Sequence, residues 1–161
     1  MSVYKDTDRA IIPHAALDDM TSMIKSGVFE IGSHTHDMHQ SAEYEAALGN
    51  DSPRIDVSRL ADEDESVYLD ALRADFDKSF EKIQKAYGSG DCLRALAYPR
   101  GVLTNEAAAL LRDEYGVKMT FSTEEGIHTV VRGLGQSLYG MKRFNVDGYM
   151  TADDVLAKIG G

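Results

Sequence analysis

A long amphipathic helix is the feature of this sequence that most constrains its fold. Between Ser66 and Tyr87 the apolar side chains recur at steps of three and four residues, the period of one helix face. They are Leu69, Leu72, Phe76, Phe80, Ile83 and Tyr87. Gly88 follows at the position where a glycine commonly ends a helix. An apolar face of this length would be exposed to water on an isolated surface helix, so the pattern predicts a helix packed on a core.

Shorter helical patterns and apolar runs alternate along the rest of the chain. The helical patterns run from His14 to Lys25, from Thr104 to Tyr115 and onward from Thr151. The β-prone runs are Val28 to Gly32, Leu93 to Tyr98, Lys118 to Ser122 and Met141 to Val146. Such alternation is typical of α/β proteins with a largely parallel sheet. The sequence therefore predicts a single α/β domain over residues 1–161.

Charge and composition exclude several classes of protein. The 161 residues carry 17 basic and 27 acidic side chains, and a net charge of −10 disfavours nucleic acid or an anionic membrane as a partner. Cys92 is the single cysteine, which excludes an internal disulfide and a Cys-rich zinc ribbon. The N-terminus is charged where a signal peptide needs an apolar stretch, and no later run is long enough to span a bilayer. We expect a soluble chain whose metal ligands, if any, are histidines and carboxylates.

Three of the five histidines, His34, His36 and His39, lie directly after the predicted strand at Val28 to Gly32. Sites in α/β folds usually lie at the carboxyl ends of strands, and neutral imidazoles are common ligands of zinc and related ions. On an extended chain His34 and His36 would share a face, whereas a turn would bring His34 and His39 together. The spacing leaves this pairing open, and a polar loop with incidental histidines is the alternative to a metal site.

The segment from Phe29 to His39, FEIGSHTHDMH, resembles the second motif of the polysaccharide deacetylases, carbohydrate esterase family 4. It matches the variant in which the two metal histidines are five residues apart. The predicted helices, the run Leu96 to Gly101 and the run Phe121 to Thr123 follow in the order of that family, so the resemblance covers most of the chain.

The resemblance implies a distorted (β/α) barrel and a metal-dependent hydrolase. The implied reaction removes N-acetyl groups from amino sugars of a bacterial surface polysaccharide or peptidoglycan, which implies a location outside the cytoplasm or at the cell surface. The implied cofactor is a divalent ion, Zn²⁺ first and Co²⁺ or Ni²⁺ as alternatives, with His34 and His39 as ligands. Tyr98 would shape the acetyl pocket, and the backbone N–H of Arg100 would help to hold the oxyanion.

Several family features have no match in this sequence. The strand that ends in Thr-Phe-Asp-Asp-Gly, which supplies the general base and the third metal ligand, is absent. Asp18 and Asp19 sit in a helical pattern and are expected on a solvated helix face, and Asp37 is expected to brace a ligand. The motif-three arginine is replaced by Ala97, and His128 is the only late histidine, with a loop surface as its expected position.

Two hypotheses follow from these departures. In the first, the chain is an N-terminally incomplete deacetylase barrel whose base and third ligand are encoded upstream. In the second, it is a degenerate, non-catalytic module of the same fold that binds carbohydrate or metal. Both predict a two-histidine metal site, and a longer reading frame with an Asp-Asp strand would favour the first.

Overall fold

The long helix α3, Glu65–Tyr87, is the largest element of the computed structural model, which describes residues 16–39, 43, 46, 49, 54–88, 92 and 94–160. The predicted stripe is confirmed, because Leu72, Phe76, Phe80 and Ile83 are all buried in one core cluster. Leu69 and Tyr87 pack against that cluster at its margin. Tyr68, which the periodicity did not include, is also buried.

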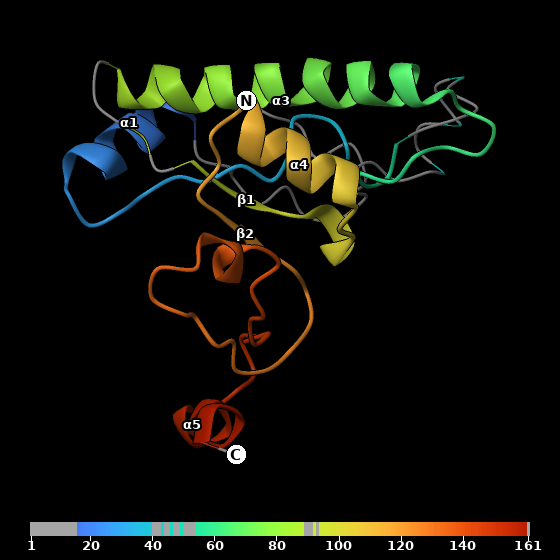
Figure 1. Cartoon of the computed structure of the whole chain (residues 1–161). Helices are drawn as coiled ribbons and strands as arrows, with labels where there is room; N and C mark the ends of the chain where they lie inside the picture. Colours follow the sequence, from blue (N-terminus) through green and yellow to red (C-terminus); the bar gives the residue numbers. More distant parts are fainter. Residues whose placement is uncertain are drawn as a thin grey trace.

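A small parallel sheet lies beneath α3 (Figure 1). It consists of β1 (Ala95–Ala97) and β2 (Met119–Phe121), paired from Ala95 with Met119 to Ala97 with Phe121. Single parallel bridges extend it on both sides, from Ser33 to Leu96 and from Met141 to Phe121. These pairings confirm a parallel arrangement. Among the described residues the strands form a two-stranded sheet, and the barrel implied by the resemblance is not seen.

Two predicted strands are not formed. Residues 28–32 are irregular, with Val28 79% and Phe29 49% exposed, and in the run Met141 to Val146 only Met141 bridges to a strand. The prediction was wrong here because β-prone residues form a strand only where a neighbouring chain offers both a pairing edge and a surface to pack on. Leu93, the predicted start of the strand that became β1, lies outside the described residues.

Helix α4, Asn105–Asp113, begins at the predicted cap. The side chain of Thr104 accepts a hydrogen bond from the N–H of Ala107 at 3.1 Å, which satisfies one of the unpaired donors of the first turn. The hydroxyl of Tyr68 on α3 bonds the same Thr104 oxygen at 2.8 Å and donates to the carbonyl of Val57 at 2.7 Å. The cap therefore also joins α4 to the core side of α3.

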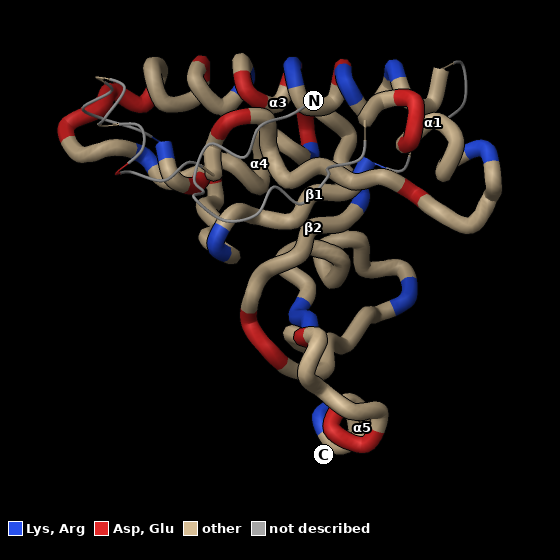
Figure 2. Tube along the Cα trace, turned by 180° about the vertical axis from the view of Figure 1, so that it is seen from behind, with Lys and Arg blue, Asp and Glu red and all other residues tan. Residues whose placement is uncertain are grey.

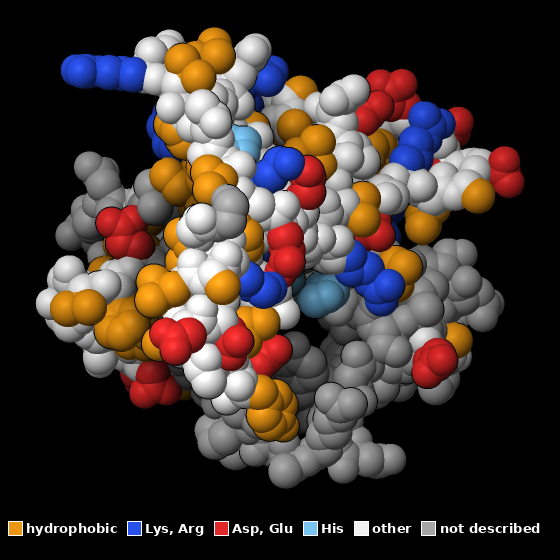
Figure 3. Space-filling view, turned by 90° about the horizontal axis from the view of Figure 1, so that it is seen from below, with side chains coloured by type: hydrophobic (Ala, Val, Ile, Leu, Met, Phe, Trp, Pro, Cys, Tyr) orange, Lys and Arg blue, Asp and Glu red, His pale blue; other side chains and the backbone are white. Residues whose placement is uncertain are grey.

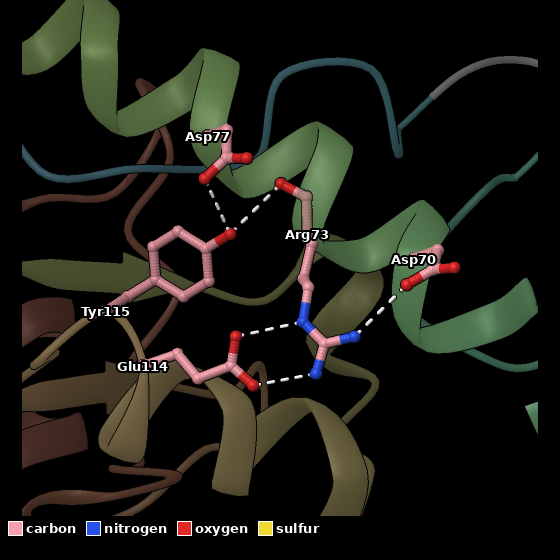
Figure 4. A network of polar contacts seen from close by, with 5 residues as sticks. All are labelled: Asp70, Arg73, Asp77, Glu114 and Tyr115. Carbon is pink, nitrogen blue, oxygen red and sulfur yellow. Dashed lines mark hydrogen bonds and ion pairs between the residues drawn. The ribbon is translucent and has the colours of Figure 1, made fainter. Parts of the chain in front are cut away.

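A polar network on the surface holds the end of α4 against α3 (Figure 4). The guanidinium of Arg73 donates to both carboxylate oxygens of Glu114, at 2.9 and 2.7 Å, and this pairing lowers the pKa of the Glu114 carboxyl. The hydroxyl of Tyr115 donates to Asp77 at 2.8 Å. Exposed ion pairs contribute little individually, so the buried apolar stripe remains the main source of stability.

The remaining helices lie at the periphery (Figure 1). Helix α1, Leu17–Lys25, packs beside α3, and its predicted start at His14 lies outside the described residues. Helix α5, Ala152–Gly160, begins after Thr151 as predicted and has no buried residue. Short 3-10 turns occur at η1, Pro99–Gly101, and η2, Gly135–Leu138.

Charge is carried by the helices and loops, whereas β1 and β2 contain no charged residue (Figure 2). In the described part of the chain, no helix combines the length and the apolar character needed to cross a membrane.

Candidate functional site

The histidine loop, residues 33–39, leaves the sheet at the carboxyl end of β1. The N–H of Ser33 donates to the carbonyl of Ala95 at 2.8 Å, and the N–H of Ala97 donates to the carbonyl of Ser33 at 2.9 Å. These two bonds run Ser33 parallel to β1, so the residues after Ser33 emerge where β1 ends. This is the edge at which parallel sheets commonly carry their sites.

The loop brings His34 and His39 together. Their ring centroids are 4.8 Å apart with an interplanar angle of 84°, and both residues are exposed. His36 faces a different neighbour, the ammonium of Lys82, which donates to its Nδ1 at 3.1 Å. Of the two pairings that the spacing left open, the structure therefore forms the one that needs a turn. Figure 3 shows histidine side chains at the surface of the molecule.

A hydrogen bond to β1 orients the ring of His34. Its Nδ1 lies 2.8 Å from the carbonyl oxygen of Ala97, and because a carbonyl only accepts, Nδ1 carries the hydrogen. In the neutral ring Nε2 then has the lone pair. Histidines that ligate metals commonly donate their other N–H to a carbonyl or carboxylate in this way. The donor set of His34 therefore fits a metal ion.

The conformation of the loop depends on Asp75, a residue that the sequence analysis did not single out. Asp75 lies on the buried face of α3 and is 6% exposed. Its two carboxylate oxygens accept the backbone N–H groups of His36, at 2.8 Å, and Asp37, at 2.6 Å. Burial raises the pKa of Asp75, and the two backbone hydrogen bonds oppose that rise. A polar residue within the apolar stripe was the sequence signal that could have revealed it.

The residues assigned to the acetyl pocket lie next to the histidine loop along the chain that follows β1. Tyr98 directly follows β1 and is fully buried in the core, and its role in an acetyl pocket stays a prediction. Burial raises the pKa of Tyr98 to about 12. The Thr120 hydroxyl opposes that rise in the pKa. It does not meet the geometry of a hydrogen bond to Tyr98, whose hydroxyl has no hydrogen-bond partner in the described part of the chain.

Arg100 is exposed and follows in the turn η1. Its φ of 55° lies in the left-handed region, which side chains other than glycine seldom adopt. Its carbonyl accepts a hydrogen bond from the Thr123 hydroxyl at 3.2 Å. The turn thus joins the ends of β1 and β2, and the oxyanion role of the Arg100 N–H stays a prediction.

The candidate carboxylates do not gather around the histidines. Asp18 and Asp19 are exposed on the first turn of α1, as expected, and Asp19 accepts the N–H of Ala16 at 2.8 Å. Asp37 is exposed within the loop itself. Within residues 16–39, 54–88 and 94–160 and the few described positions between them, no group of three or more His, Cys, Asp or Glu residues is arranged to hold a metal ion. Among these residues the structure therefore shows His34 and His39 as candidate ligands and no third.

His128 has a structural position in the C-terminal segment. Its Nε2 donates to the carbonyl of Ser137 at 2.8 Å, and its Nδ1 accepts the N–H of Lys142 at 3.4 Å. The residue is partly buried rather than on the open loop surface that we expected. Both ring nitrogens are therefore engaged in holding the loop.

Comparison with known proteins bears on the fold. Neither a family model nor a curated protein matches the sequence. A solved structure of a de-N-acetylase from Aggregatibacter actinomycetemcomitans is similar, with a TM-score of 0.66 and 20% sequence identity. The similar region covers 90% of this chain and 53% of that one, so this chain spans about half of its length. The chain therefore has a mixed helix and strand fold with a small parallel sheet, similar to that of a de-N-acetylase.

Proposed function

We propose that this chain carries the two-histidine part of the metal site of an N-deacetylase that acts on amino sugars. The observation that carries the proposal is the pairing of His34 and His39 at the carboxyl end of β1, with ring centroids 4.8 Å apart. Zinc–nitrogen bonds are about 2.0–2.1 Å long, so two rings this close are able to share one ion after small side-chain rotations. The similarity to a de-N-acetylase fold and the motif around His34 support the same assignment.

The residues at the site have distinct roles in this proposal. His34 and His39 hold the ion, and the carbonyl of Ala97 keeps His34 in the tautomer whose Nε2 is the donor atom. A divalent ion bound there would activate water and polarise an amide carbonyl. The turn at Arg100 lies at the end of β1, where its N–H would stabilise negative charge on the carbonyl oxygen of the substrate. The third ligand and the general base are assigned to an Asp-Asp strand, which this sequence does not contain.

The substrate proposed is a polysaccharide with N-acetylated amino sugars, on a bacterial surface or in peptidoglycan, outside the cytoplasm. This finer assignment depends on the motif resemblance rather than on contacts in the structure. The ion proposed is Zn²⁺, with Co²⁺ or Ni²⁺ as alternatives, because imidazole suits all three.

A second candidate function is a non-catalytic module that binds carbohydrate or metal. It is favoured by the lack of a third candidate ligand near His34 and His39 among the described residues. The two candidates differ in turnover. A deacetylase gains activity when an upstream Asp-Asp strand is present, whereas a binding module stays inactive.

Zinc calorimetry on the 161-residue chain tests the metal site. We expect modest affinity that weakens as the pH falls and the imidazoles take up protons. The double variant His34→Ala with His39→Ala should lose this binding, and His128→Ala is the matched control that should keep it. Unchanged zinc affinity in the double variant contradicts the assignment.

Acetate release from N-acetylglucosamine oligomers tests the activity, with zinc, cobalt or nickel added. The 161-residue chain should be inactive or nearly so, since loss of a positioned general base commonly lowers a rate by about 10²–10⁴. A chain extended upstream to include an Asp-Asp strand should release acetate. Turnover by the short chain would show that it already contains a base, and an inactive extended chain would favour the binding module.

A further inference from the structure

Two polar residues interrupt the buried face of α3. Asp75 and Ser79 are each 6% exposed and lie one turn apart, among Leu72, Phe76 and Phe80. A buried carboxylate is costly unless hydrogen bonds compensate for its lost hydration. An apolar residue would serve the core at that position equally well. The position of Asp75 therefore calls for an explanation beyond packing.

Both polar residues bind the histidine loop. The Asp75 oxygens accept the N–H groups of His36 and Asp37, at 2.8 and 2.6 Å, and the Ser79 and Ser33 hydroxyl oxygens are 2.6 Å apart. The Ser33 oxygen also accepts the N–H of Thr35 at 3.0 Å. Hydrogen bonds to an ionised acceptor are stronger than those between neutral groups, so Asp75 is the stronger of the two anchors.

The loop adopts a conformation that its own sequence does not favour. Thr35 has a φ of 72°, in the left-handed region, which is costly for a β-branched residue. Such a conformation persists only where surrounding contacts impose it. The two peptide groups held by Asp75 lie between His34 and His39, so they set the path of the chain that joins the two rings.

We propose that Asp75 is a positioning residue for the site, one that holds the turn through which His34 and His39 face each other. The proposal rests on the proposed function for its consequence, a preorganised pair of metal ligands. Asp75 does not act as the general base itself, because it is buried and each of its oxygens already accepts a backbone N–H.

The variant Asp75→Asn tests this role. The amide keeps the size of the side chain but has one oxygen, so one of the two N–H groups loses its acceptor. We expect zinc affinity to fall about 10–100-fold, as is usual when a group that orients a ligand is lost. Asp77→Asn is the matched control: Asp77 is exposed on the same helix, and the amide oxygen can still accept from Tyr115, so zinc affinity should not change.

A measurement on the metal-free protein separates this proposal from the proposed function. In the unmodified chain the amides of His36 and Asp37 should be protected from hydrogen exchange, and NMR should show contacts between the His34 and His39 rings. In Asp75→Asn at least one of the two amides should lose its protection and the ring contacts should weaken, while Phe76 and its neighbours keep their native chemical shifts. If the unmodified chain binds no zinc but these losses occur, the proposed function fails and the positioning role of Asp75 holds.

Two results would overturn the role of Asp75. One is a ring contact and amide protection in Asp75→Asn equal to those of the unmodified chain. The other needs no variant and so applies even if Asp75→Asn does not fold: exchange of the His36 and Asp37 amides in the unmodified chain at the rate of an open loop.

Discussion

His34 and His128 both donate a ring N–H to a backbone carbonyl at 2.8 Å, yet their chemistry differs. His34 uses Nδ1 for this bond, which leaves the lone pair of Nε2 as a donor to a metal ion. His128 uses Nε2, and its Nδ1 accepts the N–H of Lys142. His34 is oriented by one hydrogen bond and keeps a free ring nitrogen for a metal ion in this proposal, whereas both ring nitrogens of His128 are already hydrogen-bonded. The hydrogen bonds of each ring, more than its place in the sequence, thus indicate which one is suited to bind metal.

The largest expected effect concerns α3, which carries Asp75 and Ser79, the residues that bind the loop of His34. Phe76→Ala should lower the free energy of unfolding by about 3–5 kcal/mol, since it removes a fully buried ring from the core. Urea unfolding measures this loss, with the exposed Lys78→Ala as control, expected within about 0.5 kcal/mol of the unmodified chain. A loss below about 1 kcal/mol for Phe76→Ala would show that the core does not depend on this stripe.

His128→Ala tests whether His128 has a structural role and takes no part in metal binding. The substitution leaves the carbonyl of Ser137 and the N–H of Lys142 without their partner, so stability should fall by about 1–3 kcal/mol. Zinc affinity should be unchanged, whereas His34→Ala should abolish zinc binding. Equal weakening of zinc binding by the two single variants would show that the hydrogen bonds of the two rings do not decide which histidine binds metal.

The pH dependence of stability tests the anchor of the His34 loop. Because burial raises the pKa of Asp75, the native state takes up a proton at a higher pH than the unfolded chain does. The stability contributed by this difference is therefore present in acid and is lost as the pH rises through the native pKa. Unfolding of the unmodified chain and of Asp75→Asn should be measured between about pH 3 and 7. The stability of the unmodified chain relative to the variant should fall with rising pH, and a rise would show that the two backbone hydrogen bonds outweigh the burial of the carboxylate.

The smallest effect is expected at Tyr98, whose hydroxyl is buried with no hydrogen-bond partner among the described residues. Tyr98→Phe removes that unpaired group and leaves the ring in place, so stability should stay within about 1 kcal/mol or increase. Thermal unfolding measures the change. A loss above about 2 kcal/mol would show that the hydroxyl has a partner, such as an ordered water.

Much of the fold could be predicted because local patterns decide it. The stripe from Leu69 to Tyr87 predicted a helix from Ser66 to Tyr87, against an observed Glu65–Tyr87, and Thr104 correctly marked the start of α4. The predictions failed where an element depends on a partner. Val28 to Gly32 has strand propensity, but only Ser33 meets a pairing edge.

Some features of the candidate site could likewise be predicted from the sequence, and others could not. The sequence by itself determined that three histidines follow one another at short spacing, that His34 and His39 were one of two candidate pairs, and that Asp18 and Asp19 would be solvated. The tertiary structure alone decided which rings meet, because that choice depends on contacts between segments about forty to sixty residues apart: Asp75 with the loop, and Ala97 with His34. Hydrogen bonds over such distances along the chain leave no periodic signal, and only the packing of α3 and β1 against the loop brings their partners together.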